Sequence, residues 1–426
     1  MRRFWTTRLP KRDDQPQLCF AVVVKLNFQR SRDVVQGSRL FDGRNPKVFR
    51  DWVVEVEDGS ILDVGPCSRA ASGPDAGAVV DLGDVTLLPG LIDAHQHLVF
   101  DASDDPVAHL QAQDDAAVLQ WMQSAAQRAL AVGITTIRDL GDRNYLSLRL
   151  RDLFRDGHEV GPRILTAGPP LTVSGGHCWF LGGVADGEDG VRRAVRERVT
   201  HGVDVIKIMA TGGNMTPTFG PHESQYNRAE LAAAVDEAHA HGLRIAAHAH
   251  GPQGIADAFA NRVDSIEHCT FFTAEGVDAD PDLLEQLARS GVAISMTAAL
   301  LPGSEVPYPA MRKRLDAILA NCATLVRAGA RVVCSSDAGV GPNKPHDVLP
   351  HGVVFLPRMG MTNAQALTAT TAVAAEVCGI ADTTGTLEPG KDADFVAVRG
   401  NPLEDINTIH DVAAVFVKGT QVRVPT

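Results

Sequence analysis

The sequence has no stretch that approaches the roughly 18 consecutive apolar residues of a membrane-spanning helix. It also lacks an excess of positive charge. Its formal net charge is −12, whereas a protein that binds nucleic acid usually presents a basic surface. These two absences argue against a membrane protein and against nucleic acid as a partner, and they leave a small molecule as the expected ligand.

Cysteine is sparse and shows no pairing pattern. The seven cysteines are odd in number and scattered, and no two of them form a C-x-x-C pair. Such a set is typical of reduced thiols, so we expect a cytoplasmic protein. The hydrophobic fraction of 44% and the charged fraction of 22% fit a soluble globular chain. A length of 426 residues predicts one large domain and a smaller one.

The first residues form a poor secretory signal. "MRRFWTTRLPKRDDQPQ" is basic, but the apolar core "LCFAVVVKLNF" is short, Lys25 interrupts it, and no small-x-small cleavage site follows. We expect residues 1–32 to be a disordered, loosely attached extension, or a stretch upstream of the native start.

The rest of the chain shows two kinds of sequence pattern. Residues 33–86 and 384–426 contain short β-type runs separated by Gly and Asp turns. Residues 87–383 alternate apolar strand-like runs with helical ones, and eight strands can be counted from "LLPGLIDAH" onwards. Such alternation predicts parallel βα units. We therefore expect an α/β protein with a (β/α)₈ TIM-like barrel over 87–383 and a composite β-sandwich built from both chain ends.

Residues able to bind a metal lie where the predicted strands end. In a (β/α)₈ barrel the active site is at the C-terminal ends of the strands. The first strand ends in two histidines at i and i+2, which share one face of a strand and can therefore bind one ion. The groups at the strand ends are His95, His97, Lys207, His248, His250, His268 and Asp337.

Each of these residues also has an ordinary structural explanation. Lys207 could pair with a buried carboxylate, Asp337 could cap the next helix, and His250 could be a hydrogen-bonded core histidine. The coincidence of so many metal-competent groups at the ends of five strands favours a metal site over these separate explanations.

The motifs together resemble the amidohydrolase superfamily of metal-dependent hydrolases. The resemblance runs from about Val34 to the C-terminus and is strongest to the imidazolonepropionase-like, Xaa-Pro-dipeptidase-like branch. The motifs that carry it are "PGLIDAHQH", "GITTIRDLGD", "GGH" at 175–177, "VIKIMATGG", "HAHG", "SIEH", "SSDAG" and "GTLEPGKDADFVAV".

The resemblance implies a site with two divalent metal ions, for which Zn is the first expectation and Mn or Co are alternatives. His95 and His97 would bind the more buried ion with Asp337. Lys207 would be carboxylated by carbon dioxide, and its carbamate would bridge both ions. The second ion would be bound by His268 and His248. His248 is preferred over His250 because its 20-residue spacing to His268 fits the pattern of the branch that the sequence resembles.

The resemblance also implies a mechanism, in which a metal-bridging hydroxide attacks an amide carbonyl. Asp337 would accept the nucleophile's proton and pass it to the leaving amine. His177 and His250 would stabilise the developing oxyanion. Tyr226 could bind a substrate carboxylate, although a tyrosine packed in a loop is an equal alternative. Gly212 and Gly213 would allow the backbone to approach the substrate closely, or would form only a flexible turn.

We expect hydrolysis of an amide bond in a dipeptide-like or N-acyl substrate. The alternatives are a mononuclear cyclic-amide hydrolase or a deaminase, and a lactone, ester or carbamate hydrolase. The resemblance implies that a deaminase of this superfamily would have a Glu three residues after a histidine of the fifth strand and would lack the lysine of the fourth. Here "HAHGPQG" has no such Glu and Lys207 is present, so both features favour two metals. A non-catalytic scaffold would be expected to lack a ligand, and none is missing. A homo-oligomer is left open.

Overall fold

The structure is a computed structural model that describes residues 32–70, 76–216, 218–304 and 309–422. The extension predicted for residues 1–32 therefore lies outside the described residues, apart from Arg32, where the first strand begins. In the described part of the chain, no helix is long and apolar enough to cross a membrane.

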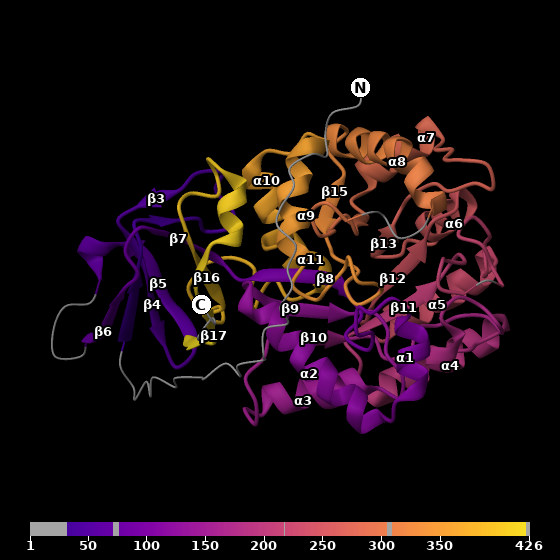
Figure 1. Cartoon of the computed structure of the whole chain (residues 1–426), viewed down its shortest axis with the longest axis horizontal. Coiled ribbons are helices and arrows are strands. Elements are labelled where there is room, and N and C mark those ends of the chain that lie inside the picture. Colours follow the sequence, from indigo (N-terminus) through magenta and orange to yellow (C-terminus); the bar gives the residue numbers. More distant parts are fainter. Residues whose placement is uncertain (1–31, 71–75, 217, 305–308, 423–426) are drawn as a thin grey trace.

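Both chain ends contribute strands to the β-rich part of the molecule, the indigo and yellow lobe of Figure 1. Its strands are β1(Arg32–Gln36), β2(Arg39–Leu40), β3(Phe49–Arg50), β4(Trp52–Glu57), β5(Ser60–Pro66), β6(Ala76–Asp81), β7(Val85–Pro89), β16(Phe395–Arg399), β17(Val412–Val417) and β18(Thr420–Val422). A four-stranded sheet has the order β5-β4-β1-β6, and a six-stranded sheet has the order β18-β17-β16-β7-β2-β3. The second sheet joins residues from opposite ends of the sequence.

The central strands β7 and β16 of the six-stranded sheet are buried on both faces, which explains their continuous apolar runs. In β16, Phe395 packs into an apolar cluster shared with Val54 and Ile61 of the four-stranded sheet. Val396, the next residue along β16, packs into the large core of the α/β part instead. Successive side chains of a strand point to opposite faces. The sheet therefore links the small β core to the large one.

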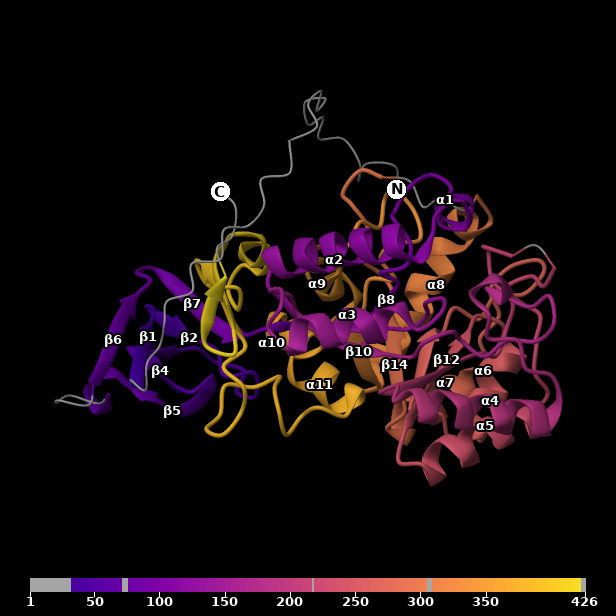
Figure 2. The same cartoon turned by 90° about the horizontal axis from the view of Figure 1, so that it is seen from below.

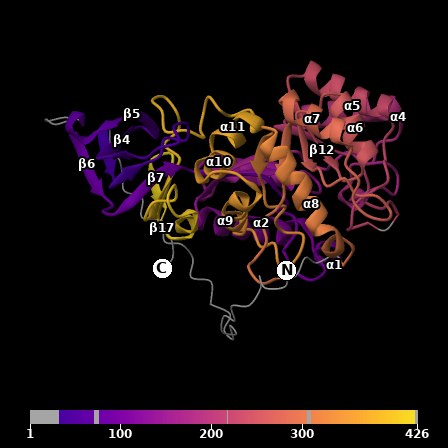
Figure 3. The same ribbon diagram turned by 90° about the horizontal axis from the view of Figure 1, so that it is seen from above.

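Parallel strands alternate with helices in the remainder of the chain. The strands are β8(Leu91–Gln96), β9(Ile134–Asp139), β10(Arg163–Thr166), β11(Val205–Met209), β12(Arg244–Ala249), β13(Ser265–His268), β14(Ala293–Met296) and β15(Arg331–Cys334). The helices are α1(Pro106–Ala112), α2(Asp115–Ala131), α3(Leu146–Arg155), α4(Gly187–His201), α5(Arg228–Ala240), α6(Pro252–Ala260), α7(Pro281–Ser290), α8(Pro309–Arg327), α9(Leu349–Phe355), α10(Asn363–Thr368) and α11(Ala372–Cys378). Short 3₁₀ turns are η1(Cys67–Arg69), η2(Trp179–Leu181), η3(Leu356–Met359) and η4(Ile406–His410). Figures 2 and 3 show helices α4 to α7 at the end of the molecule farthest from the β lobe.

The eight parallel strands follow one another in chain order. They form a three-stranded sheet, β10-β9-β8, and a five-stranded sheet, β11-β12-β13-β14-β15. Two isolated parallel bridges connect these sheets, Gln96 with Ala338 and Leu171 with Ile208. The eight strands and the helices α2 to α8 lie where the sequence pattern predicted them, so a mixed α/β fold is confirmed.

The first predicted strand is divided in the structure. β7 ends at Pro89 and belongs to the six-stranded sheet, whereas β8 begins at Leu91 and belongs to the parallel set. Gly90 lies between them, and a Cβ atom at this position would collide with the side chain of Thr135. The predicted boundary between residues 86 and 87 consequently falls inside β7.

Local sequence signals explain where several helices begin. Asn227 and Glu230 form a capping box at the start of α5, and Asp280 with Pro281 begins α7. These side chains satisfy backbone N–H groups that have no partner within the helix. Helices α5 and α7 are thereby fixed at their N-terminal ends, which follow β11 and β13 in the chain.

Candidate metal and active site

The residues that the sequence predicts as metal ligands lie in the parallel strands or just after their C-terminal ends. His95 is in β8, Lys207 in β11, His248 in β12 and His268 at the end of β13, and Asp337 follows β15 by three residues. The side chains of these three histidines and of Lys207 are each at most 9% exposed. The C-terminal ends of parallel strands lie together at one end of the sheet. These residues therefore meet although they are far apart in the sequence.

The first group of side chains centres on His95. Nε2 of His95 lies 3.2 Å from Nε2 of His97, and Oδ1 of Asp337 lies 3.5 Å and 3.4 Å from these two nitrogens. Nζ of Lys207 lies 3.5 Å from Nε2 of His95. The convergence that i and i+2 spacing predicted for His95 and His97 is therefore present, and a carboxylate and an amine complete the group.

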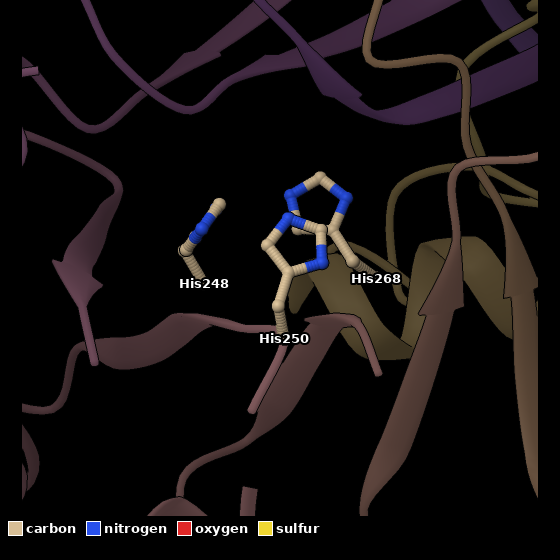
Figure 4. Close-up of side chains that lie close together, drawn as sticks. All are labelled: His248, His250 and His268. Atoms are coloured by element: carbon tan, nitrogen blue, oxygen red, sulfur yellow. The ribbon is translucent and has the colours of Figure 1, made fainter. Parts of the chain in front are cut away.

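A second group consists of His248, His250 and His268, whose ligand atoms all lie within 4.8 Å of one another (Figure 4). The rings of His250 and His268 are stacked with centroids 4.5 Å apart. His268 belongs to both groups, because it also forms a potential metal-binding set with His95 and Asp337. Both His248 and His250 are thus close enough to share an ion with His268.

Each histidine of the second group uses one ring nitrogen for a hydrogen bond. Nε2 of His248 donates to the carbonyl of Gly212 at 3.0 Å. Nδ1 of His250 lies 2.8 Å from the Thr270 hydroxyl, and Nδ1 of His268 lies 2.8 Å from the Thr297 hydroxyl. A hydrogen bond at one nitrogen fixes the ring and leaves the other nitrogen for a ligand.

The electrostatics keep these imidazoles neutral. Burial lowers the pKa of His95 and of His250 to about 4 in each case. Burial, together with the charges of neighbouring histidines, lowers the pKa of His248 and of His268 well below the usual value. Only the neutral ring offers a lone pair to a metal ion, so the site is prepared for coordination at physiological pH.

The pKa values of Lys207 and Asp337 are both lowered, which favours the neutral form of the lysine and the charged form of the aspartate. Burial lowers the pKa of Lys207 to about 8, although the charges of Glu267 and Asp337 oppose this shift. Burial alone would raise the pKa of Asp337, but the hydrogen bond with His97 and the positive charge of Lys344 hold it below the usual range. The site therefore combines an ionised carboxylate with a lysine that loses its proton more readily than an exposed one.

Backbone strain is found at two of these positions. His268 has φ +69° and Asp337 has φ +55°, a left-handed conformation that non-glycine residues seldom adopt. Residues in such conformations are concentrated at functional sites, where the surrounding structure holds them. At these two strand ends the strained backbone places the imidazole and the carboxylate within the same cluster.

Glu267 and Arg138 are functional residues that the sequence analysis missed. Nδ1 of His95 donates to Oε2 of Glu267 at 2.8 Å, and Arg138 donates to the other oxygen, Oε1, at 3.0 Å. Ser265 also donates to Oε1, at 2.6 Å. The available signal was a charged residue within each of the buried strands "ITTIRD" and "SIEH".

The remaining predicted residues fall into two sets. His177 is buried, its ring lies 4.7 Å from that of His248, and its Nδ1 has no hydrogen-bond partner in the described part of the chain. A Cβ atom on Gly213 would collide with the His177 ring, so a glycine is required there. Gly212 holds His248 through its carbonyl. Tyr226, by contrast, is buried and donates its hydroxyl to Ala185 at 2.9 Å.

A cavity of about 260 Å³ lies against both groups of ligands. His97, His177, Lys207 and Asp337 line it, as do the three histidines of the second group. Tyr226 does not contribute to its wall, and neither do Gly212 and Gly213, which lie behind His248 and His177. The structure thus joins the predicted metal ligands to a space that a substrate can occupy.

Comparisons with known proteins find relatives in sequence and in structure. Ochratoxinase of Aspergillus niger is 28% identical over 366 residues, which cover 77% of this chain and 73% of that protein. Imidazolonepropionase of Salinispora tropica is 28% identical over 374 residues, covering 82% of this chain and 86% of the other. The crystal structure of a Xaa-Pro dipeptidase with methionine bound in its active site superposes with a TM-score of 0.80 at 27% identity, covering 92% of this chain and all of that one.

The sequence pattern of the Amidohydrolase family matches residues 86–422, which include every candidate ligand and the wall of the cavity. The strand-end histidines, the lysine and the carboxylate that the motifs predicted are the residues that the fold gathers. The chain therefore belongs to the amidohydrolase family and is a hydrolase that acts on carbon–nitrogen bonds.

Proposed function

We propose that the protein is a binuclear metal-dependent amidohydrolase that cleaves the amide bond of an N-acyl or dipeptide-like substrate. The observation that carries this proposal is the position of Lys207. Its Nζ lies 3.5 Å from Nε2 of His95 in the first group, and Lys207 lines the same cavity as His248 of the second group. A lysine carbamate at this point would supply an oxygen to each of two ions.

The donor set fits divalent metal ions. His95, His97 and Asp337 offer two imidazoles and a carboxylate to one ion, and His248 with His268 offers imidazoles to the second. Neutral imidazole and carboxylate are ligands that Zn accepts readily, so Zn is the ion we assign first.

Lys207 meets the requirements for a carbamate. It is 1% exposed, and the described residues provide no ion pair for its Nζ. A buried ammonium is costly even where the charges of Glu267 and Asp337 partly oppose its loss of a proton, and it would repel nearby cations. Modification of the neutral amine converts this side chain into an anion and so removes both difficulties.

When bound, two divalent ions supply Lewis acidity, which lowers the pKa of water and polarises a carbonyl group. Asp337, an ionised carboxylate on the cavity wall, accepts the proton of the attacking water and delivers it to the leaving amine. His177 and His250 face the same cavity. A ring nitrogen of each can donate a hydrogen bond to the carbonyl oxygen as its negative charge develops.

The architecture that we propose for this reaction is a closed (β/α)₈ barrel with a composite β-sandwich. The parallel bridges at Gln96 and at Leu171 support closure, since they connect the three-stranded and five-stranded sheets at both edges. The apolar cluster shared by the four- and six-stranded sheets supports the sandwich. Six cysteines in the described part of the chain are free thiols, which supports our assignment to the reducing cytoplasm.

The function is tested by measuring metal content and amide hydrolysis on the same preparation. Protein purified without chelator is analysed for metals and assayed, after addition of Zn, against N-acyl amino acids, dipeptides, neutral N-alkyl amides and lactones. We expect about two metals per chain and hydrolysis of at least one class of amide. Full activity with one metal per chain would establish the mononuclear alternative, and cleavage of lactones alone would exclude an amidase.

A further inference from the structure

The wall of the active-site cavity is polar near the candidate metal ligands and mostly apolar farther from them. The side that we assign to catalysis is formed by imidazoles, Lys207 and Asp337. The rest of the wall is formed by α8, by residues 298–304 after β14, and by α9 and η3. This second side is mostly apolar: its members include Leu300, Leu301, Leu315, Ile318, Leu319 and Phe355. A substrate bound for hydrolysis would therefore extend from polar groups into apolar ones.

Methionine is concentrated at this cavity. Five of the eight methionines in the chain line it, and they come from β11 with the loop that follows it, from β14, from α8 and from η3: Met209, Met215, Met296, Met311 and Met359. A methionine side chain is unbranched, flexible and polarisable, so it adapts its shape to the group that it contacts. A wall of this composition suits alkyl and aryl groups of varied outline better than one rigid ligand.

The same wall offers little to a negatively charged group. Apart from histidines, the charged residues of the cavity are Lys207, Asp337 and Lys344 in the described part of the chain. Nζ of Lys344 already donates to the carbonyls of Thr297, at 3.0 Å, and Ser336, at 2.6 Å. Among the described residues, no arginine lines the cavity. The apolar side includes the polar side chains of Ser304 and His351, but burial lowers the pKa of His351. A substrate carboxylate placed there would therefore be desolvated without a fixed positive charge, which is costly.

We propose that the apolar side of this cavity binds an alkyl or aryl group attached to the scissile amide. The substrate class is then an amide with a bulky apolar substituent that requires no carboxylate for recognition. This assignment rests on the proposed function, because it uses the same site, and it narrows the substrate from dipeptide-like amides to apolar ones. The occupant is the substrate itself, since the apolar wall is continuous with the catalytic residues.

Binding can be measured independently of catalysis. The metal-containing protein is titrated with N-phenyl-1-naphthylamine, an uncharged apolar fluorophore, and the probe is displaced by two series of neutral amides. One series lengthens the acyl chain of N-methyl alkanamides, and the other lengthens the alkyl group of N-alkyl acetamides. We expect affinity to rise about fourfold per added methylene in at least one series until the cavity is filled.

Two variants of the apolar wall test the location. Leu315→Gln places a polar amide on the cavity face of α8, and Ala298→Phe fills part of the space from the segment after β14. Each should reduce the affinity for the longest amides at least tenfold and leave the affinity for N-methylacetamide within twofold. Val326→Gln is the matched control on α8, because Val326 is similarly part-buried but does not line the cavity. Thermal unfolding of each variant separates loss of binding from loss of fold.

The outcomes distinguish this inference from the proposed function. Chain-length-dependent binding without hydrolysis would support the apolar site and contradict the amidase. Hydrolysis combined with equal affinity for short and long amides would overturn the apolar site alone. N-octanoylglycine and N-octanoylglycinamide provide the last comparison: we expect the neutral amide to bind at least as tightly, and a tenfold preference for the carboxylate would also overturn the inference.

Discussion

Nδ1 of His95 lies 2.8 Å from Oε2 of Glu267, although 172 residues separate the two in the sequence. Neither side chain is more than 1% exposed. Because the carboxylate accepts the hydrogen bond from Nδ1, the tautomer of His95 is fixed and the lone pair of Nε2 is left free for a cation beside His97 and Asp337. Arg138 neutralises the carboxylate from its other side at 3.0 Å. A metal-binding histidine is commonly oriented by such a partner.

Glu267→Gln should weaken metal binding about 10- to 100-fold, because the neutral amide holds the His95 tautomer less firmly. It should also destabilise the fold by about 3 kcal/mol, since Arg138 is left buried without its counter-charge. Competition with a chelator measures the first effect and denaturant unfolding the second. Glu285→Gln, at an exposed pair on α7 with Arg289, is the control and should change neither. If Glu267→Gln left the metal affinity unchanged, Glu267 would have no role in orienting His95 for metal binding.

Lys207→Ala should reduce the metal content from about two ions per chain to one or fewer and abolish nearly all turnover. The physical reason is the loss of the only group that we assign to both ions. Addition of a short carboxylic acid with excess metal should restore part of the activity by occupying the vacated space. Lys313→Ala, at an exposed position of α8, is the control. Two tightly bound ions and near-normal turnover in Lys207→Ala would mean that the lysine has no bridging role.

Removal of metal should lower the melting temperature, and its return should restore it. The candidate ligands are buried groups assembled only in the folded chain, so bound metal stabilises the native state by mass action. A free metal concentration one hundred times the dissociation constant contributes about 2.7 kcal/mol. Calorimetry of chelator-treated protein, with and without added Zn, gives the measurement. Equal melting temperatures in both samples would show that these residues do not bind the ion.

Gly213→Ala should lower turnover about 10- to 100-fold and leave two metals bound. The new methyl group collides with the His177 ring and displaces a side chain that we assign to the oxyanion, and small displacements of this kind cost rate rather than binding of the metal. The control is Gly276→Ala, where a Cβ atom meets nothing within 4 Å. Kinetics and elemental analysis are compared for both variants. If Gly213→Ala turned over substrate like the control, His177 would have no part in the reaction.

Tyr226→Phe should destabilise the protein by about 1 kcal/mol and leave catalysis unchanged. The hydroxyl of Tyr226 donates to the carbonyl of Ala185, which loses its partner in the variant. Because Tyr226 does not line the cavity, no substrate contact is removed. Chemical denaturation and steady-state kinetics provide the two readouts. A rise in KM without a change in stability would instead assign Tyr226 to substrate binding.

The sequence by itself determined the elements and the ligand types. Alternating apolar runs predicted the eight parallel strands, because the side-chain periods of strands and helices differ and are local properties. The spacing of His95 and His97 predicted a shared face for the same reason. Once the strands were expected to be parallel, Lys207, His268 and Asp337 could be assigned to one end of them without any knowledge of side-chain contacts.

Only the tertiary structure decided which distant groups touch. The contact between His95 and Glu267 depends on the strand register, and the sharing of His268 between two ligand groups depends on its backbone conformation at φ +69°. The hydroxyl of Tyr226 donates to Ala185 and Tyr226 does not line the cavity, whereas the methionines that line it come from β11 and its following loop, β14, α8 and η3. These relations arise from packing between segments far apart in the chain, where the position of one side chain is set by neighbours that no local pattern identifies.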